Sequence, residues 1–354
     1  MTGRKHFILA IDGGGVRGLV PLRVLESLET RMRARGKSGP LHRYFDLMAG
    51  TSTGGLIVAG LSAPKPDDMS GAPAATVEEL RGFFEVEARE VFHRRRLLER
   101  LVTNPLTLFD QRYDERPLEG LLKARFGWTS IASALTHVVL TAYDMEAREA
   151  VFMTNGRQSD GSRPDDFYFW QAVRATTAAP VYFEPAKVEN LTRGTDQVLV
   201  DGGVFLNNPV LAAYVEGRKL GWRPEDMVIL SLGTGARRHR GYSYEEAAGW
   251  GALGWLSPAN DTPLLSVLSH GQATTAAYQA DWLLPEAGVG EVIRLDGELP
   301  RAAEAIDNTR PGNIIELNGV ADRIIRDNTE LLDRLAGEIS ERSDWTAGGL
   351  SQHG

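Results

Sequence analysis

The stretch AGTSTGG, Ala49 to Gly55, places Ser52 between two glycines with one threonine on each side. It ends an apolar run at 44–50 that is typical of a buried strand, and a helix pattern begins at Gly54 and continues to about Leu61. The G-x-S-x-G spacing is typical of a nucleophile elbow, a sharp strand-to-helix turn that exposes its serine. The alternative is that Ser52 only caps the following helix. The other motifs of the sequence have to decide whether Ser52 is a nucleophile or a helix cap.

Two other apolar runs also end in glycines. The run HFILAID at 6–12 leads into GGGVRG at 13–18, and QVLV at 197–200 leads into DGG at 201–203. Ligands in open α/β sheets bind outside the carboxyl ends of the strands, so we expect the three loops to converge on one cleft. Consecutive glycines before a helix also offer backbone N–H groups to an anion, such as the oxyanion of an acyl-transfer reaction.

Strand and helix patterns alternate along the chain. Strands are predicted at 6–12, 44–50, 136–145, 148–155, 197–203 and 226–235, and helices at 18–36, 54–61, 76–101, 167–177, 209–220, 262–284 and 318–341. Continuous apolar strands indicate a mostly parallel sheet covered on both faces, which is an α/β fold. Because we find no linker, we expect one domain over 1–343, with its motifs within 6–285, a last helix at about 318–341 and a disordered tail at 344–354.

Composition excludes several kinds of protein. The 354 residues include no cysteine, which rules out disulfides, zinc–thiolate sites, iron–sulfur clusters and a cysteine nucleophile. A net charge of −8 argues against nucleic acid as a partner. The amino-terminal apolar run lacks the features of a signal peptide, and no stretch approaches the ~18 apolar residues of a spanning helix. We therefore expect a cytoplasmic protein that can contact a membrane peripherally.

A serine nucleophile needs a base, and the chain has seven histidines. Of these only His239 follows a strand end, and arginines flank it with no orienting acid nearby. Asp201 is better placed, since it ends a strand beside bare glycine backbone and a carboxylate can itself act as base. We therefore predict a Ser52–Asp201 dyad. The loop at 13–18 also fits a dinucleotide fingerprint, but the next strand ends in Gly50-Thr51-Ser52 rather than in an acid.

Together these blocks resemble the patatin-like phospholipase family, of the bacterial and intracellular type. The matching blocks are DGGGVRG (12–18), GTSTGG (50–55), ATTAAPVYFEP (175–185), DGG (201–203), ILSLGTG (229–235) and GWGALGWL (249–256). They occur in the family's order, although the third glycine-rich motif ends in Gly203 where many members carry alanine. The resemblance implies a three-layer α/β/α lipid acyl hydrolase of the phospholipase A or lysophospholipase type.

The same resemblance assigns roles to residues. It implies Ser52 as nucleophile, Asp201 as base and an acyl-serine intermediate, with no metal or cofactor. Backbone amides of Gly13, Gly14 and Gly15 would form the oxyanion hole, and Arg17 would order that loop or meet a phosphate. The supporting motif residues are Asp12, Arg17, Gly18, Gly50, Gly54, Gly202 and Gly203. The substrate would be a phospholipid, lysophospholipid or galactolipid.

Several alternatives stay open. The dyad would serve a transacylase equally well, and a lipid-binding protein with an inactive site or a nucleotide-activated, membrane-degrading effector is also conceivable. The segment 92–109 mixes basic and apolar residues as an interfacial helix does, or it packs on its own domain. Trp250, Trp255 and Leu256 could line a lipid path, although core positions are the commoner use. Loops at 62–75 and 156–166 are candidate gates. The oligomeric state, head group and acyl chain length are left open.

Overall fold

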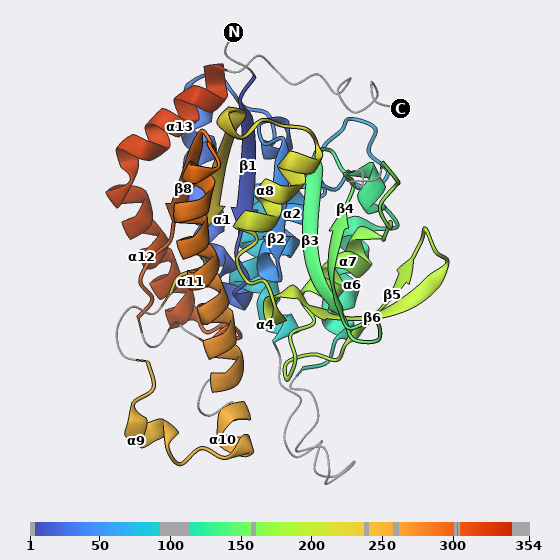
Figure 1. The fold of residues 1–354 in the computed structure, drawn as a ribbon, viewed down its shortest axis with the longest axis vertical. Helices are drawn as coiled ribbons and strands as arrows, with labels where there is room; N and C mark the ends of the chain where they lie inside the picture. Colours follow the sequence, from blue (N-terminus) through green and yellow to red (C-terminus); the bar gives the residue numbers. More distant parts are fainter. Residues whose placement is uncertain are drawn as a thin grey trace.

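An eight-stranded sheet forms the centre of the molecule (Figure 1). The computed structural model describes residues 4–92, 113–156, 161–236, 241–257, 262–300, 303 and 305–341. The strands are β1 (His6–Ile11), β2 (Leu47–Thr51), β3 (His137–Asp144), β4 (Glu149–Thr154), β5 (Ala186–Asn190), β6 (Thr195–Asp201), β7 (Met227–Leu232) and β8 (Glu291–Leu295). Their order is β5-β6-β3-β2-β1-β7-β8, and β4 also pairs with β3.

Twelve helices are described in the same residues. They are α1 (Leu19–Ala34), α2 (Thr53–Ser62), α3 (Val77–Gly82), α4 (Ala88–Val91), α6 (Arg116–Phe126), α7 (Phe169–Thr176), α8 (Val210–Lys219), α9 (Tyr244–Ala247), α10 (Ala252–Leu256), α11 (Pro263–Glu286), α12 (Pro311–Asp327) and α13 (Thr329–Glu341). None of the described helices is long and apolar enough to cross a membrane.

The sheet is parallel at its centre and antiparallel on one side. Strands β3, β2, β1, β7 and β8 run parallel to their neighbours, whereas β4, β5 and β6 join through antiparallel pairs. Every residue of β2 and β7 is buried, as is every residue of β1 after His6. This burial on both faces is why the central strands read as continuous apolar runs, and it confirms the predicted mostly parallel sheet.

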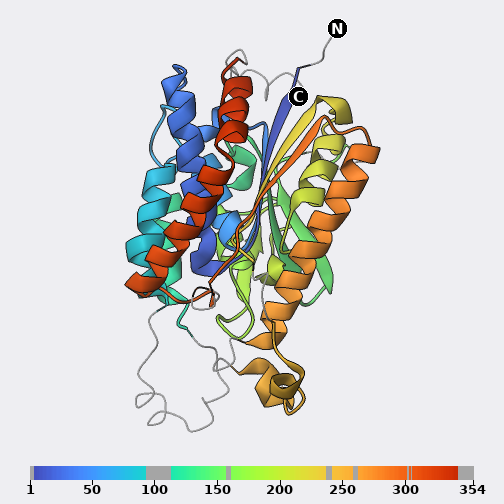
Figure 2. The ribbon, with the colours of Figure 1, turned by 90° about the vertical axis from the view of Figure 1, so that its left-hand side faces the viewer.

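Two layers of helices cover the sheet, as the view in Figure 2 shows. Successive side chains of a strand point to opposite faces. Accordingly Leu9 and Ile11 of β1 pack in the larger core cluster, with α1, α2, α12 and α13. Ile8 and Ala10 pack in the smaller cluster, with α8 and α11. The predicted three-layer α/β/α architecture is confirmed, and α11 is an outer element of the thinner layer.

Some elements differ from the sequence prediction. Strands β5 and β8 and helices α6, α9 and α10 were not predicted. The single helix expected at 318–341 is two helices, α12 and α13, separated at Asn328, whose side-chain amide donates to the Ile324 carbonyl at 2.8 Å. The helix expected at 76–101 is interrupted by a π-helical turn, η3 (Phe83–Glu87), between α3 and α4, and its part beyond residue 92 lies outside the described residues.

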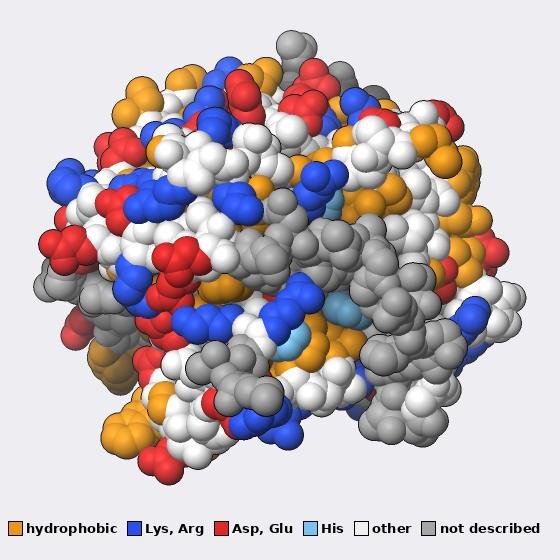
Figure 3. All heavy atoms as spheres, turned by 90° about the horizontal axis from the view of Figure 1, so that it is seen from above, with side chains coloured by type: hydrophobic (Ala, Val, Ile, Leu, Met, Phe, Trp, Pro, Cys, Tyr) orange, Lys and Arg blue, Asp and Glu red, His pale blue; other side chains and the backbone are white. Residues whose placement is uncertain are grey.

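The end of the molecule where the parallel strands begin is shown in Figure 3, with basic and acidic side chains interspersed. His6 and His137 lie at strand starts, and both contact the Trp222 ring, with centroid separations of 4.2 Å and 6.1 Å. None of the predicted motif residues belongs to these strand starts. The candidate chemistry therefore lies at the opposite end of the sheet.

Candidate active site

The ends of β2 and β6 meet on one edge of β3. Strand β4 pairs along the other edge of β3, from Val139 to Asp144, so β2 and β6 must share the remaining edge. Thr51 of β2 lies beside Thr141, and Asp201 of β6 lies beside the next residue, Ala142. The chain thus brings Asp201 next to the residue that follows Thr51, which is Ser52.

The three glycine loops do converge, but one of them does so for a different reason than expected. Strand β6 runs antiparallel to β3, so its carboxyl end does not belong to the parallel set. Asp201 reaches the site because β3 extends three residues beyond its pairing with β2 and offers β6 a place to end there. The expectation that Asp201 lies at the carboxyl end of a strand of the parallel set was therefore wrong.

Ser52 sits on a strained turn between β2 and α2. Its φ of 55° and ψ of −121° lie in a region that residues with side chains rarely adopt, which is the geometry of a nucleophile elbow. A Cβ at Gly50 would stand 2.3 Å from the Gly54 backbone, so this turn requires glycine. The Ser52 side chain makes no capping hydrogen bond to α2, which removes the helix-cap alternative.

The Ser52 side chain instead lies close enough to the Asp201 carboxylate to lower the pKa of that carboxyl. The Gly203 N–H donates to the same carboxylate, at 2.7 Å from Oδ1. Asp201 is only 4% exposed, and this burial raises its pKa to about 7, against the lowering effects of Ser52 and of the Gly203 N–H. A carboxyl with this pKa, placed beside a hydroxyl, can accept a proton near neutral pH.

No histidine lines the pocket beside Ser52 in the part of the chain that the structure describes. His270 lies on α11 and is exposed. His239, the alternative base, lies outside the described residues. Asp201 is therefore the base candidate that the geometry supplies, and its role stays a prediction.

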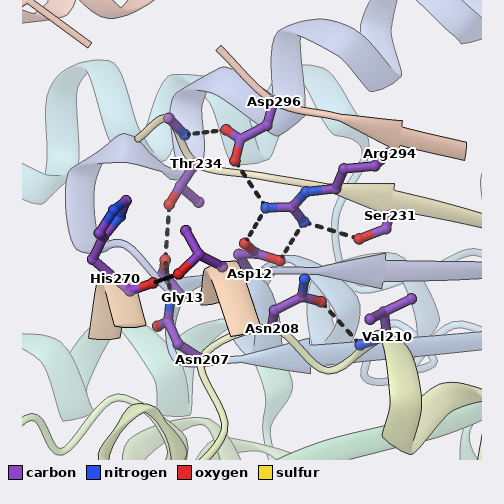
Figure 4. Close-up of polar contacts among 12 residues, drawn as sticks. Asp12, Gly13, Asn207, Asn208, Val210, Ser231, Thr234, His270, Arg294 and Asp296 are labelled. Atoms are coloured by element: carbon purple, nitrogen blue, oxygen red, sulfur yellow. Dashed lines mark hydrogen bonds and ion pairs between the residues drawn. The ribbon is translucent and has the colours of Figure 1, made fainter. Parts of the chain in front are cut away.

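The glycine loop after β1 is pinned through its carbonyl groups (Figure 4). The Gly13 carbonyl accepts from Thr234 Oγ1 at 2.8 Å and Asn207 Nδ2 at 3.4 Å, and the Gly14 carbonyl accepts from Arg17 Nε at 3.1 Å. In a trans peptide the N–H points opposite to the C=O. These contacts therefore orient the N–H groups of Gly14 and Gly15 away from the pinning side chains.

The three glycines of this loop are not equivalent. The Gly13 N–H already donates to the Asn207 carbonyl at 3.0 Å, so it is occupied in this structure. Gly15 has a φ of 58° and lines the pocket beside Ser52. The oxyanion hole predicted at the three glycines stays a prediction, and the geometry favours Gly14 and Gly15 as its donors.

Asp12 holds the start of this loop through an ion pair that sequence reasoning missed. Its carboxylate accepts from both Arg294 nitrogens, at 2.8 Å and 2.6 Å, and Arg294 also contacts Ser231 at 2.9 Å and Asp296 at 2.8 Å (Figure 4). Burial raises the pKa of Asp12 to about 6, against the lowering effect of Arg294. The cluster ties together β1, β7 and β8. A sequence signal existed: Arg294 is the one charged residue inside the apolar run VIRL.

An apolar pocket opens beside Ser52. Besides Gly15, Ser52 and Thr53, its lining residues are mostly apolar and aromatic: Leu56, Phe83, Phe84, Ala88, Val91, Phe92, Leu118, Thr177, Ala179, Tyr182, Phe183 and Ile306. Phe83 and Phe84 come from the π-helical turn η3, a type of turn that is frequent at functional sites. The pocket presents almost no polar groups, and it suits an alkyl chain.

The other segments proposed for lipid entry lie elsewhere. Trp255 is 37% and Leu256 43% exposed, so these two residues are not part of the core. Trp250 packs on Trp255, with 5.3 Å between the ring centroids. None of the three residues lines the pocket beside Ser52. Loop 62–75 contributes nothing to the pocket lining. Of segment 92–109 only Phe92 is described, and it does line the pocket. The candidate gate at 156–166 is described only in part.

Comparison with known proteins shows the family of the chain. The family model described as "Patatin-like phospholipase" matches residues 9–214, which is more than half of the chain. The chain belongs to the patatin-like phospholipase family. Membership in this family implies lipid acyl hydrolase activity.

Several plant members of the patatin-like family are similar over most of their length. "Patatin-like protein 2" of Arabidopsis thaliana is 33% identical over 76% of this chain and 69% of its own. "Patatin-like protein 1" of Oryza sativa subsp. indica is 28% identical over 96% and 86%. "Probable inactive patatin-3-Kuras 1" of Solanum tuberosum is 27% identical over 96% and 94%. Because that last relative is named as inactive, similarity alone does not establish activity. Activity has to be argued from the residues of this chain.

Proposed function

We propose that the chain hydrolyses fatty acyl esters of phospholipids or lysophospholipids, with Ser52 as nucleophile and Asp201 as base. The observation that carries the proposal is the placement of Ser52, on a strained elbow, next to the buried carboxylate of Asp201, whose pKa it lowers. As part of the same proposal we place the chain with the intracellular, bacterial members of the family; the absence of cysteine fits a reducing compartment.

The dyad would act in two balanced steps. Asp201 accepts the Ser52 proton while Oγ attacks the ester carbonyl, and the resulting oxyanion accepts hydrogen bonds from the N–H groups of Gly14 and Gly15. Collapse breaks the ester C–O bond, and the departing alcohol takes the proton from Asp201. Water then attacks the acyl-serine and gives a proton to Asp201, and that proton returns to Ser52 as the fatty acid leaves.

The apolar lining of the pocket favours a substrate whose acyl group is a long alkyl chain over one with a small acyl group. Phe83, Phe84 and Leu118 would bury the alkyl chain, and each buried methylene contributes ~0.8 kcal/mol to binding. An acyl chain anchored there would place its carbonyl at the pocket end that contains Ser52. A polar head group has no partner inside this lining, so it would stay outside the pocket.

The first test is hydrolysis of a medium-chain p-nitrophenyl ester and of phosphatidylcholine by the pure protein. Ser52→Ala and Asp201→Asn should each lower kcat by at least ~10³-fold. Matched exposed controls, Ser70→Ala and Asp67→Asn in loop 62–75, should keep full activity. Full activity of Asp201→Asn would refute the dyad. Transfer of the acyl group to an added alcohol at the expense of free fatty acid would identify a transacylase instead.

A further inference from the structure

An apolar ridge runs along α10 and the first turns of α11. Its side chains are large, apolar and exposed: Leu253 (72%), Trp255 (37%), Leu256 (43%), Leu264 (39%), Val267 (48%) and Leu268 (44%). We call these six residues the α10–α11 ridge. Tyr278 and Trp282, 67% and 65% exposed, extend the same side of α11 at helical spacing. Large apolar side chains that are exposed on neighbouring helices indicate an interaction site.

Charge around the ridge favours a neutral partner. From residue 262 to 280 the sequence contains no lysine, arginine, aspartate or glutamate, and α10 contains none either. Of the charged side chains that the structure describes just before α10, Glu245 and Glu246 of α9 are exposed. These carboxylates would repel an anionic membrane, whereas a zwitterionic phospholipid surface meets apolar side chains without that penalty.

The ridge lies at the end of the molecule that contains the site. In both Figure 1 and Figure 2, α9 and α10 project beyond the body of the fold at the lower end, where the parallel strands end. Thr262 directly precedes α11, and its hydroxyl lies 3.4 Å from the hydroxyl of Tyr182, a residue of the pocket lining. The ridge therefore starts next to the pocket wall.

Helix α11 also contacts the loop of the candidate base. Gln272 Nε2 donates to the Val204 carbonyl at 2.9 Å, in the helical turn η6 (Gly202–Val204) that directly follows Asp201. One helix thus carries the exposed apolar side chains and touches both the pocket wall and the base loop. A surface that binds the ridge would lie beside the pocket entrance.

We propose that the α10–α11 ridge docks on a neutral phospholipid interface and inserts its leucine and tryptophan side chains there. Docking presents the pocket beside Ser52 to lipids that are still in the membrane or micelle. A projecting ridge suits a fluid interface, which closes around inserted side chains on all sides. This inference rests on the proposed lipid hydrolase function, for which it names the physical form of the substrate.

The test measures binding to phosphatidylcholine vesicles by co-sedimentation and tryptophan fluorescence. The full chain carries Ser52→Ala so that vesicles stay intact. We expect binding that changes less than twofold between 0.1 M and 0.5 M NaCl, because no ion pairs are involved. Adding Leu253→Glu with Leu268→Glu should weaken binding at least ~10-fold. The control is Met69→Glu, at a fully exposed methionine in loop 62–75, and it should bind like its parent.

The outcomes that would contradict the docking proposal can be distinguished from one another. Absence of vesicle binding by the parent, or equal loss in the ridge variant and the Met69→Glu control, overturns the proposal. If light scattering shows a dimer that the ridge variant converts into a folded monomer, the ridge is an interface between two copies and not a lipid surface. Thermal unfolding verifies that each variant folds.

Activity separates this inference from the proposed function. If the chain with an intact Ser52 cleaves a soluble ester yet does not bind vesicles, only the docking surface is refuted. If it binds vesicles through the ridge yet cleaves no ester, the hydrolase proposal is the one that falls. In the ridge variant, hydrolysis of vesicle lipid should fall at least ~10-fold further than hydrolysis of a soluble ester.

Discussion

Replacing Asp201 by asparagine should abolish activity and at the same time stabilise the fold. Asparagine is nearly isosteric and can still accept the Gly203 N–H, but it cannot take a proton from Ser52. In the wild type, burial raises the Asp201 pKa from 3.8 to about 7. The folded state therefore bears a cost for ionising this carboxyl that the asparagine variant does not have.

The size of that cost depends on pH. Between pH 3.8 and 7 the unfolded chain releases the Asp201 proton while the folded chain keeps it, so rising pH favours unfolding until the folded pKa is passed. Each pH unit in this window is worth 1.36 kcal/mol. The cost is about 2 kcal/mol at pH 5 and about 4 kcal/mol at pH 8, where it levels off.

Urea unfolding of the wild type and of Asp201→Asn at pH 5 and pH 8 measures this difference. We expect the variant to gain about 2 to 3 kcal/mol of unfolding free energy relative to the wild type between the two pH values. Because the comparison is a difference between two pH values, any constant effect of the new amide cancels. An offset between the two proteins that is the same at pH 5 and pH 8 would refute the assignment of a desolvated carboxyl with a raised pKa.

Three further predictions concern the site. The kcat/KM for a soluble ester should rise about tenfold per pH unit below pH 7 and level off above it, since Asp201 must be ionised, and a flat profile from pH 5 to 8 would contradict this role. Thr234→Val removes the hydrogen bond to the Gly13 carbonyl and should lower kcat ~10-fold to ~100-fold with little change in KM, whereas an equal change in both would indicate a binding defect. Arg294→Met leaves the Asp12 carboxyl buried without its partner and should lower the free energy of unfolding by ~3 kcal/mol in urea, and an unchanged midpoint would show that the pair adds nothing.

The parts of the site that could be predicted are those encoded locally. The elbow around Ser52 depends on glycines within two residues of it, and Asp201 is followed directly by the glycines that let its carboxylate sit against the backbone. The residues that could not be predicted act across the sheet. Thr234 and Arg294 contact the first glycine loop only because β7 lies beside β1 and β8 lies beside β7, and no spacing in the sequence gives that strand order.

The break between α12 and α13 and the exposure of α10 also depend on tertiary contacts. An apolar pattern in a helix predicts that some partner covers it, but not which one. For the segment 262–284 the helix itself was predicted, whereas the large apolar exposure of its first turns could not be.

By itself the sequence determined an α/β fold with a mostly parallel sheet, the strand-to-helix turn at Ser52 and the family resemblance, because apolar periodicity and glycine-rich turns act over a few residues. Only the tertiary structure decided that β6 pairs antiparallel with the part of the β3 edge that extends beyond β2, and that Asp201 therefore ends beside Ser52. It also decided which amides of the glycine loop remain available and which face of α11 stays uncovered. These outcomes depend on pairing between segments far apart in the chain, and that pairing is chosen by the packing of the whole sheet and its two helical layers.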